Sequence, residues 1–101
     1  MAKPIEPTTD FLPQVMRVEH HLAVRATCPV DGTADVYDVV VRTGRVIKVA
    51  EILAVSERLA QAPVFQEALT CGLASELGAE VQSTGWHSGV RTVVVCGEIG
   101  Q

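Results

Sequence analysis

Two runs of alternating apolar and polar residues, separated by a short turn, constrain the fold of this chain more than any other feature. Even-numbered positions are mostly apolar over residues 14–28, and odd-numbered positions are mostly apolar over residues 35–43. Alternation of this kind is typical of a strand with one buried face. The Pro-Val-Asp-Gly sequence of residues 29–32 supplies turn-forming residues between the runs. The sequence therefore predicts an antiparallel hairpin.

The middle of the chain changes to helical spacing. Apolar residues that include Val49 and Leu53 recur at helical intervals over residues 46–60. Pro63 suits the first position of a second helix, and Gly78 suits the end of it. The sequence therefore predicts two consecutive helices after the hairpin.

Two further strands are predicted near the end of the chain, over residues 79–83 and 90–96, with Gly85, Ser88 and Gly89 in the turn between them. The order is strand, strand, helix, helix, strand, strand. The predicted class is α+β, a four-stranded antiparallel sheet with both helices on one face. The two outer strand edges need protection, and assembly of several sheets into a closed ring is one solution.

Length and charge limit the domain count and the partners. The 101 residues predict one domain, residues 14–98, after a flexible arm of residues 1–13 that contains three prolines. The net charge is −4 and no basic cluster is present. This composition argues against autonomous binding to a nucleic-acid backbone. A small-molecule substrate, or a nucleic acid held near its reacting base, fits better.

The cysteines indicate the compartment. Cys28, Cys71 and Cys96 are an odd number without paired spacing, so neither a disulfide framework nor a CxxC metal site is expected. Cys71 and Cys96 are predicted to be core residues. No signal-peptide pattern and no apolar run of about 18 residues occurs, so the expected location is the cytoplasm, with no membrane partner.

Cys28 and Asp35 are the candidate catalytic residues. The thiol ends the first strand and the carboxylate begins the second, so both can face one cleft at the hairpin turn. A thiolate is a strong nucleophile, and a neighbouring carboxyl group can transfer a proton. The alternatives are a buried structural cysteine and an aspartate that only ends the turn. Asp31 is the better turn residue, which leaves Asp35 available.

A family resemblance rests on three features beside the element order. They are Cys28-Pro29, Asp35 seven residues after the cysteine, and Phe65-Gln66-Glu67 at the start of the second helix. With them, residues 14 to 97 resemble the tunnelling fold (T-fold), and within it the 7-cyano-7-deazaguanine reductase group (QueF). The single-domain QueF-like enzymes that form amidines are the most similar. The resemblance implies an oligomeric barrel with sites at subunit interfaces.

The resemblance also implies a reaction. The Cys28 thiolate would attack the nitrile of 7-cyano-7-deazaguanine to form a covalent thioimide, and Asp35 would supply a proton. Ammonia would then release an archaeosine-type amidine without a cofactor. The substrate would be the free base or the base within tRNA or DNA.

Binding residues follow from the same resemblance. Glu67 would read the purine edge, and Phe65, Gln66 and His87 would complete the substrate site. From the residues alone, Glu67 can be a solvated residue that favours the helix dipole, and Phe65 can be a core residue. His87 can be an exposed loop residue, or it can reach the pocket and supply basic function.

Departures from the family pattern bear on the reaction. The reductase has a Glu-Ser-Lys-Ser-Leu-Lys signature associated with NADPH, which residues 45–52 lack, and an Arg-Gly-Gly turn where this chain has His87-Ser88-Gly89. Gln66 stands where the family has histidine. The missing signature and the changed turn favour the amidine-forming enzyme over an NADPH-dependent nitrile reductase. With Gln66, any proton relay through that histidine is missing. A non-catalytic purine-binding T-fold module remains a further alternative.

A metal site is not expected. His20 and His21 are adjacent on a strand, so their side chains point to opposite faces, and no partner stands at ligand spacing. T-fold enzymes that act on pterins rely on histidine, zinc or lysine arrangements that this sequence lacks. Trp86 is a candidate interface residue.

Overall fold

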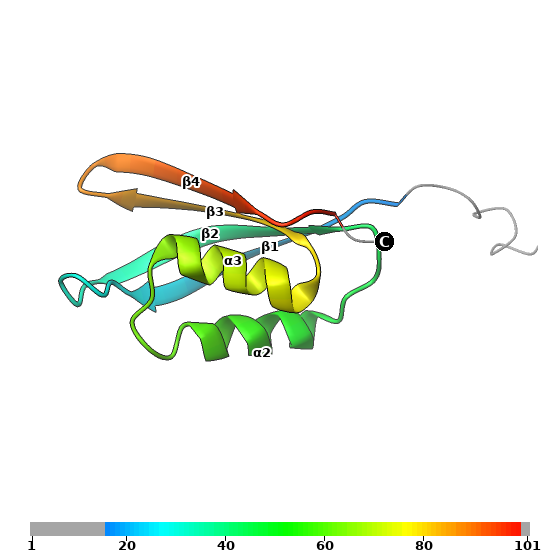
Figure 1. Cartoon of the computed structure of the whole chain (residues 1–101), viewed down its shortest axis with the longest axis horizontal. Helices are drawn as coiled ribbons and strands as arrows, with labels where there is room; N and C mark the ends of the chain where they lie inside the picture. Colours follow the sequence, from blue (N-terminus) through cyan, green and yellow to red (C-terminus); the bar gives the residue numbers. More distant parts are fainter. Residues whose placement is uncertain (1–15, 100–101) are drawn as a thin grey trace, which may run out of the picture.

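A computed structural model describes residues 16–99, which form one sheet with two helices on one of its faces (Figure 1). The elements are β1 (Val18–Thr27), β2 (Ala34–Thr43), α2 (Val49–Leu59), α3 (Gln66–Leu77), β3 (Glu80–His87) and β4 (Val90–Cys96). The sheet order is β1-β2-β3-β4, and every neighbouring pair is antiparallel. The predicted element order is therefore confirmed. The predicted arm of residues 1–13 lies outside the described residues.

The β1–β2 hairpin buries the face that the alternation predicts. Its register runs from Val18 opposite Thr43 to Thr27 opposite Ala34. The buried side chains on this face are Val24, Ala26, Tyr37, Val39 and Val41. Burial of each larger apolar side chain stabilises the fold by about 1.5–3 kcal/mol. The hairpin therefore supplies one wall of the core.

Helix α3 supplies the opposite wall. Leu69, Leu73 and Leu77 are completely buried, and the helix packs on β3 and β4. The helix ends at Gly78, whose φ of 61° lies in the left-handed region that glycine adopts without strain. The Arg45 guanidinium donates a 2.5 Å hydrogen bond to the Leu77 carbonyl oxygen. Both features stop the helix where β3 must begin.

Helix α2 is less embedded than its spacing predicts. It begins at Val49 rather than near residue 46, and it buries Ile52 and Ser56. Val49 and Leu53 are 59% and 53% exposed. The reason is that α2 packs beside α3, so only a narrow stripe of the helix meets the core.

The last hairpin differs from the prediction at β3. The strand runs to His87, so Gly85 lies within it and Trp86 lies exposed on the face opposite the helices. Ser88 and Gly89, with φ of 51° and 83°, form the whole turn. Two consecutive residues with positive φ are typical of a tight type I′ hairpin turn, which matches the twist of the strands.

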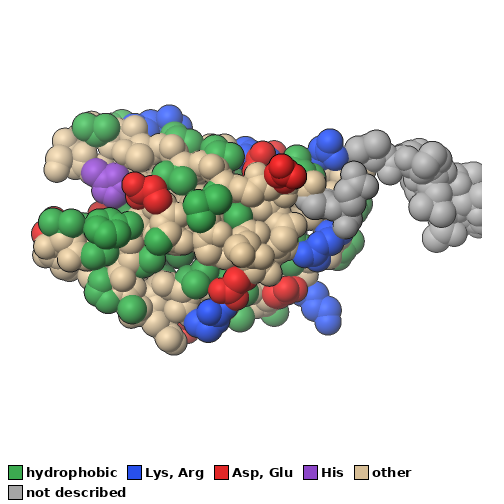
Figure 2. All heavy atoms as spheres, in the orientation of Figure 1, with side chains coloured by type: hydrophobic (Ala, Val, Ile, Leu, Met, Phe, Trp, Pro, Cys, Tyr) green, Lys and Arg blue, Asp and Glu red, His purple; other side chains and the backbone are tan. Residues whose placement is uncertain are grey.

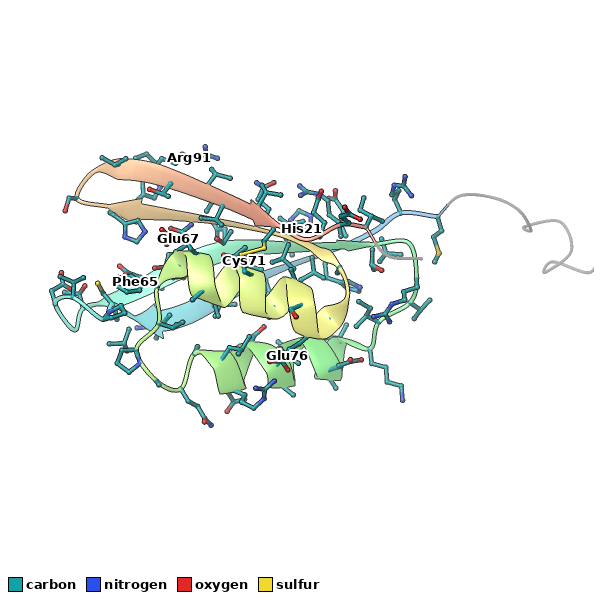
Figure 3. The ribbon with its side chains drawn as sticks, viewed as in Figure 1. His21, Phe65, Glu67, Cys71, Glu76 and Arg91 are labelled. Atoms are coloured by element: carbon teal, nitrogen blue, oxygen red, sulfur yellow. A yellow bond between two sulfur atoms is a disulfide. The ribbon has the colours of Figure 1, made fainter. Side chains whose placement is uncertain are left out.

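The prediction that Cys71 and Cys96 are unpaired core residues is wrong. Cys71 lies on the exposed side of α3, Cys96 ends β4 half-buried, and the two form a disulfide (Figure 3). Their sequence separation of 25 carries no pairing signal. The pairing arises because α3 lies across β4, which brings the two elements together.

Across residues 16–99, neither helix is long and apolar enough to span a membrane. Over the same residues, no group of three or more His, Cys, Asp or Glu side chains is placed to hold a metal ion.

Loss of this disulfide should destabilise the protein. Closing a loop of 25 residues restricts the unfolded chain and is worth about 3 kcal/mol. We expect C71S to lower the free energy of unfolding by that amount, measured by urea denaturation under oxidising conditions. A reductant should destabilise the wild type equally and leave C71S unchanged. A wild type whose unfolding midpoint is insensitive to reductant would contradict the pairing.

Candidate active site at the hairpin end of the sheet

A cavity of about 300 Å³ lies where the β1–β2 turn, the start of α3 and the end of β3 meet. Figure 1 shows these segments at the same end of the molecule. Figure 2 shows a notch at that end, with a histidine and an acidic side chain beside it. The cavity is lined by all the residues predicted for the site, namely Cys28, Asp35, Phe65, Gln66, Glu67 and His87. Tyr37 and Thr92 also line it, and the sequence did not single them out for the site.

The hairpin turn places Cys28. The Cys28 N–H donates to the Thr33 carbonyl oxygen at 2.8 Å, and the Gly32 N–H donates to the Cys28 carbonyl oxygen at 2.9 Å. Gly32 has a φ of 73°, a conformation that glycine adopts readily. The turn therefore holds the backbone of Cys28 directly after β1, and its free thiol is half-buried at the cavity wall.

Asp31 takes the turn role that the sequence predicts. Its Oδ1 accepts hydrogen bonds from the Thr33 N–H at 3.0 Å and from the Thr33 hydroxyl at 2.7 Å. These two bonds lower the pKa of Asp31, and the Cys28 thiol lowers it further. Because Asp31 stabilises the turn, the half-buried Asp35 is free to line the cavity.

The start of α3 is attached to the hairpin by one backbone hydrogen bond. The Val64 N–H donates to the Thr27 carbonyl oxygen at 3.0 Å, one residue before Cys28. Figure 3 shows Phe65 and Glu67 at this end of α3, near the β1–β2 turn. Glu67 is exposed, and Phe65 is 54% exposed at the cavity, so the interpretation of Phe65 as a core residue is wrong.

Tyr37 lines the cavity together with Cys28, Asp35 and Glu67. Its side chain is buried, and its hydroxyl donates a long hydrogen bond of 3.4 Å to Asp35 Oδ2. The ring lies on β3 at Gly85, where an added Cβ would come within 2.5 Å of the ring. A signal in the sequence was the position of Tyr37 two residues after Asp35, which puts both side chains on one face of β2.

The pKa of Tyr37 responds to its burial and to the charged groups around it. Burial raises the pKa of Tyr37 to about 12, helped by the charge of Asp35 and then by the charges of Cys28 and Glu67. The phenol therefore stays protonated and remains a hydrogen-bond donor. The cavity thus combines a thiol, two carboxylates and a neutral hydroxyl.

Gln66 and His87 form the remaining wall. The buried Gln66 amide donates from Nε2 to the Ser83 carbonyl, the Ser83 hydroxyl and the Thr92 carbonyl, at 3.3, 3.0 and 3.1 Å. Gln66 Oε1 lies 2.8 Å from His87 Nε2. The His87 ring also lies near Tyr37, with centroids 5.9 Å apart. Gln66 therefore reaches the cavity mainly through His87.

Comparison with known proteins supports the fold. No family model matches the sequence, and none of the curated proteins matches it. Among solved structures, it is similar to the crystal structure of the archaeosine synthase QueF-Like in the apo form, with a TM-score of 0.68 and 20% identity. The match covers 82% of this chain and 91% of that chain. The predicted T-fold class, with a QueF-like arrangement of elements, is therefore confirmed.

The environment of Tyr37 predicts its titration. Tyr37 is the only tyrosine, so phenolate absorbance reports it alone, and we expect a midpoint near pH 12. The folded-state pKa exceeds the unfolded value of about 10. The resulting stabilisation is therefore complete below pH 10 and is lost as pH rises through 12.

Substitution of Asp35 tests the cause of this shift. We expect D35N to bring the midpoint down part of the way toward 10, because burial still acts while the neighbouring charge is gone. D38N is the matched control, because Asp38 is exposed on the other face of the sheet. An equal shift in D38N would exclude a specific contact with Asp35.

Proposed function

We propose that this protein is a QueF-like enzyme that converts the nitrile of 7-cyano-7-deazaguanine to an amidine with ammonia. One observation carries the proposal. Cys28 from the β1–β2 turn, Asp35 from β2 and Glu67 from α3 line a single cavity of about 300 Å³. The fold around that cavity is similar to that of an archaeosine synthase.

The first step uses Cys28 and Asp35. The Cys28 sulfur bonds to the nitrile carbon, and the carbon–nitrogen triple bond becomes a double bond. The thiol proton passes through the Asp35 carboxyl group to the nitrile nitrogen, which gives a thioimide. General acid catalysis of this kind contributes about 10²–10⁴-fold. The neutral Tyr37 hydroxyl, 3.4 Å from Asp35 Oδ2, orients that carboxyl group.

The second step releases the product. Ammonia bonds to the thioimide carbon, the carbon–sulfur bond breaks, and Cys28 returns as a thiol. No electrons are gained or lost, so this sequence of steps needs no redox cofactor. The product is an archaeosine-type 7-formamidino-7-deazaguanine.

The cavity also suits recognition of the base. Its volume of about 300 Å³ is at the small end of the range for ligand pockets, which fits one bicyclic base. The Glu67 carboxylate can accept two N–H groups of the guanine-like edge, a charge-assisted pair. The exposed Phe65 ring can stack on the base, and Gln66 and His87 also line the cavity. The base can enter free or as part of tRNA or DNA.

Intact mass spectrometry tests the covalent step. We expect 7-cyano-7-deazaguanine to add its full mass to the wild type and to C28A not at all. C71S is the matched control and should still form the adduct, because Cys71 lies away from the cavity. An unmodified wild type at saturating ligand, with the base supplied both free and within an oligonucleotide, would refute the proposal.

The fate of the adduct distinguishes related activities. With ammonia alone, the product should be the amidine. An aminomethyl product that requires NADPH would identify a nitrile reductase instead. A wild type that binds the base tightly without an adduct would identify a purine-binding module.

We further propose a homo-oligomer with sites at subunit interfaces. Within residues 16–99, β1 and β4 each pair on one edge only. The sheet face opposite the helices exposes Val36, Trp86, Val93 and Val95. Unpaired edges beside an apolar face favour pairing with a second copy, which would extend the sheet and cover these side chains.

Native mass spectrometry should therefore show a multiple of the 10.8 kDa chain. We expect V95K to shift the distribution toward the monomer, because it places a charge on the exposed face of the edge strand. V46K is the control at another exposed valine, which lies outside the strands. A wild type that stays monomeric at high concentration would contradict the assembly.

A further inference from the structure

Gln66 and His87 form a hydrogen-bonded pair in the cavity wall to which the two steps above assign no chemical role. Gln66 is 2% exposed, and its Oε1 lies 2.8 Å from His87 Nε2. Amide and imidazole groups can each be placed in two orientations. The neighbouring groups decide both orientations.

The carbonyl oxygens of Ser83 and Thr92 fix the Gln66 amide. A carbonyl oxygen only accepts hydrogen bonds, so the amide nitrogen must face these two atoms, at 3.3 and 3.1 Å. Gln66 Oε1 must then face His87.

The hydroxyl groups of Thr70 and Ser83 lead independently to the same orientation of the Gln66 amide. Thr70 donates its hydroxyl hydrogen to the Gln66 backbone carbonyl at 2.7 Å. Ser83 must therefore donate at the 2.6 Å contact between the Thr70 and Ser83 hydroxyls. The Ser83 oxygen is then left to accept from Gln66, which again identifies the nearby amide atom as nitrogen.

The orientation of Gln66 determines the tautomer of His87. Gln66 Oε1 can only accept, so His87 Nε2 must carry a hydrogen. In the neutral ring, Nδ1 then holds the lone pair. Among the described residues, Nδ1 has no hydrogen-bond partner, and it is not among the buried unpaired atoms, so solvent reaches it. His87 lines the cavity, so this lone pair is available to a reactant there.

The other titratable groups of the cavity already have a role in the proposed function or stay protonated. Cys28 is the nucleophile, Asp35 carries the proton of the first step, and Glu67 holds the base. Tyr37, with a pKa of about 12, stays protonated. His87 is the remaining side chain of the cavity with a free nitrogen lone pair that can accept a proton.

Resting on the proposed function, we propose that His87 is the base of the ammonia step and that Gln66 is its positioning residue. Ammonia bonds to the thioimide carbon through its lone pair, and the imine electrons move onto the imine nitrogen. His87 Nδ1 takes a proton from the added nitrogen. The double bond re-forms as the carbon–sulfur bond breaks, and the imidazolium returns the proton to the Cys28 sulfur.

The tautomer is tested without substrate by long-range ¹H–¹⁵N NMR of the whole protein. We expect His87 to be a single tautomer with hydrogen on Nε2. A hydrogen on Nδ1, or a mixture at His87, would overturn the assignment.

Two matched variants test the positioning role of Gln66. We expect Gln66→Glu to hold His87 doubly protonated, because a carboxylate faces Nε2, and so to remove the lone pair. Gln82→Glu, on the opposite face of the sheet, should leave the His87 signals unchanged. If Gln66→Glu does not fold, the wild-type spectrum alone decides the tautomer.

The step is tested with His87→Asn. We expect the thioimide to form at the wild-type rate but to persist, with amidine release slowed at least about 100-fold, as for loss of a general base. Added imidazole should restore part of the rate, which it would not do for a structural defect. Adduct resolution at the wild-type rate, or a folded variant that forms no adduct, would overturn the role of His87. Absence of the adduct in the wild type would instead refute the proposed function, while the NMR result would stand by itself.

Discussion

The cavity depends on the hydrogen bond from the Val64 N–H to the Thr27 carbonyl oxygen. It joins the loop between the helices to the end of β1, so the nucleophile and the first turn of α3 share one location. Leu69, Leu73 and Leu77 then anchor α3 on the sheet. Together with that packing, the contact places Cys28 and Glu67 beside one cavity.

The sequence predicts the fold well because the fold follows local patterns. Alternation marked the hairpin, and Gly78 marked the end of α3 correctly. Predictions from the sequence pattern were wrong where tertiary contacts determine the local structure. Gly85 was predicted to be a turn residue, yet it lies within β3. A glycine is required there because the Tyr37 ring occupies the space that a side chain would need. Cys71 and Cys96 carried no spacing signal, because only the packing of α3 over β4 brings them together.

The residues of the candidate site could be predicted from the sequence, but the contacts between them could not. Cys28, Asp35 and Glu67 were chosen by residue type and family resemblance, and the fold brings them to one cavity. Tyr37 was not predicted as a site residue, since an apolar strand face does not reveal which of its side chains lies beside a pocket. The pairing of Gln66 with His87 joins two residues 21 positions apart, so it depends on the final register of α3 against β3.

The disulfide between α3 and β4 also shapes how the molecule opens. It closes a loop that contains all of β3 and the last hairpin turn. β4 lies at the edge of the sheet, and an edge strand would ordinarily fray on its own. Here its release requires α3 to leave as well, since the two are covalently joined. The amide protons of α3, β3 and β4 should therefore exchange with solvent as a single cooperative unit, slower than those of α2.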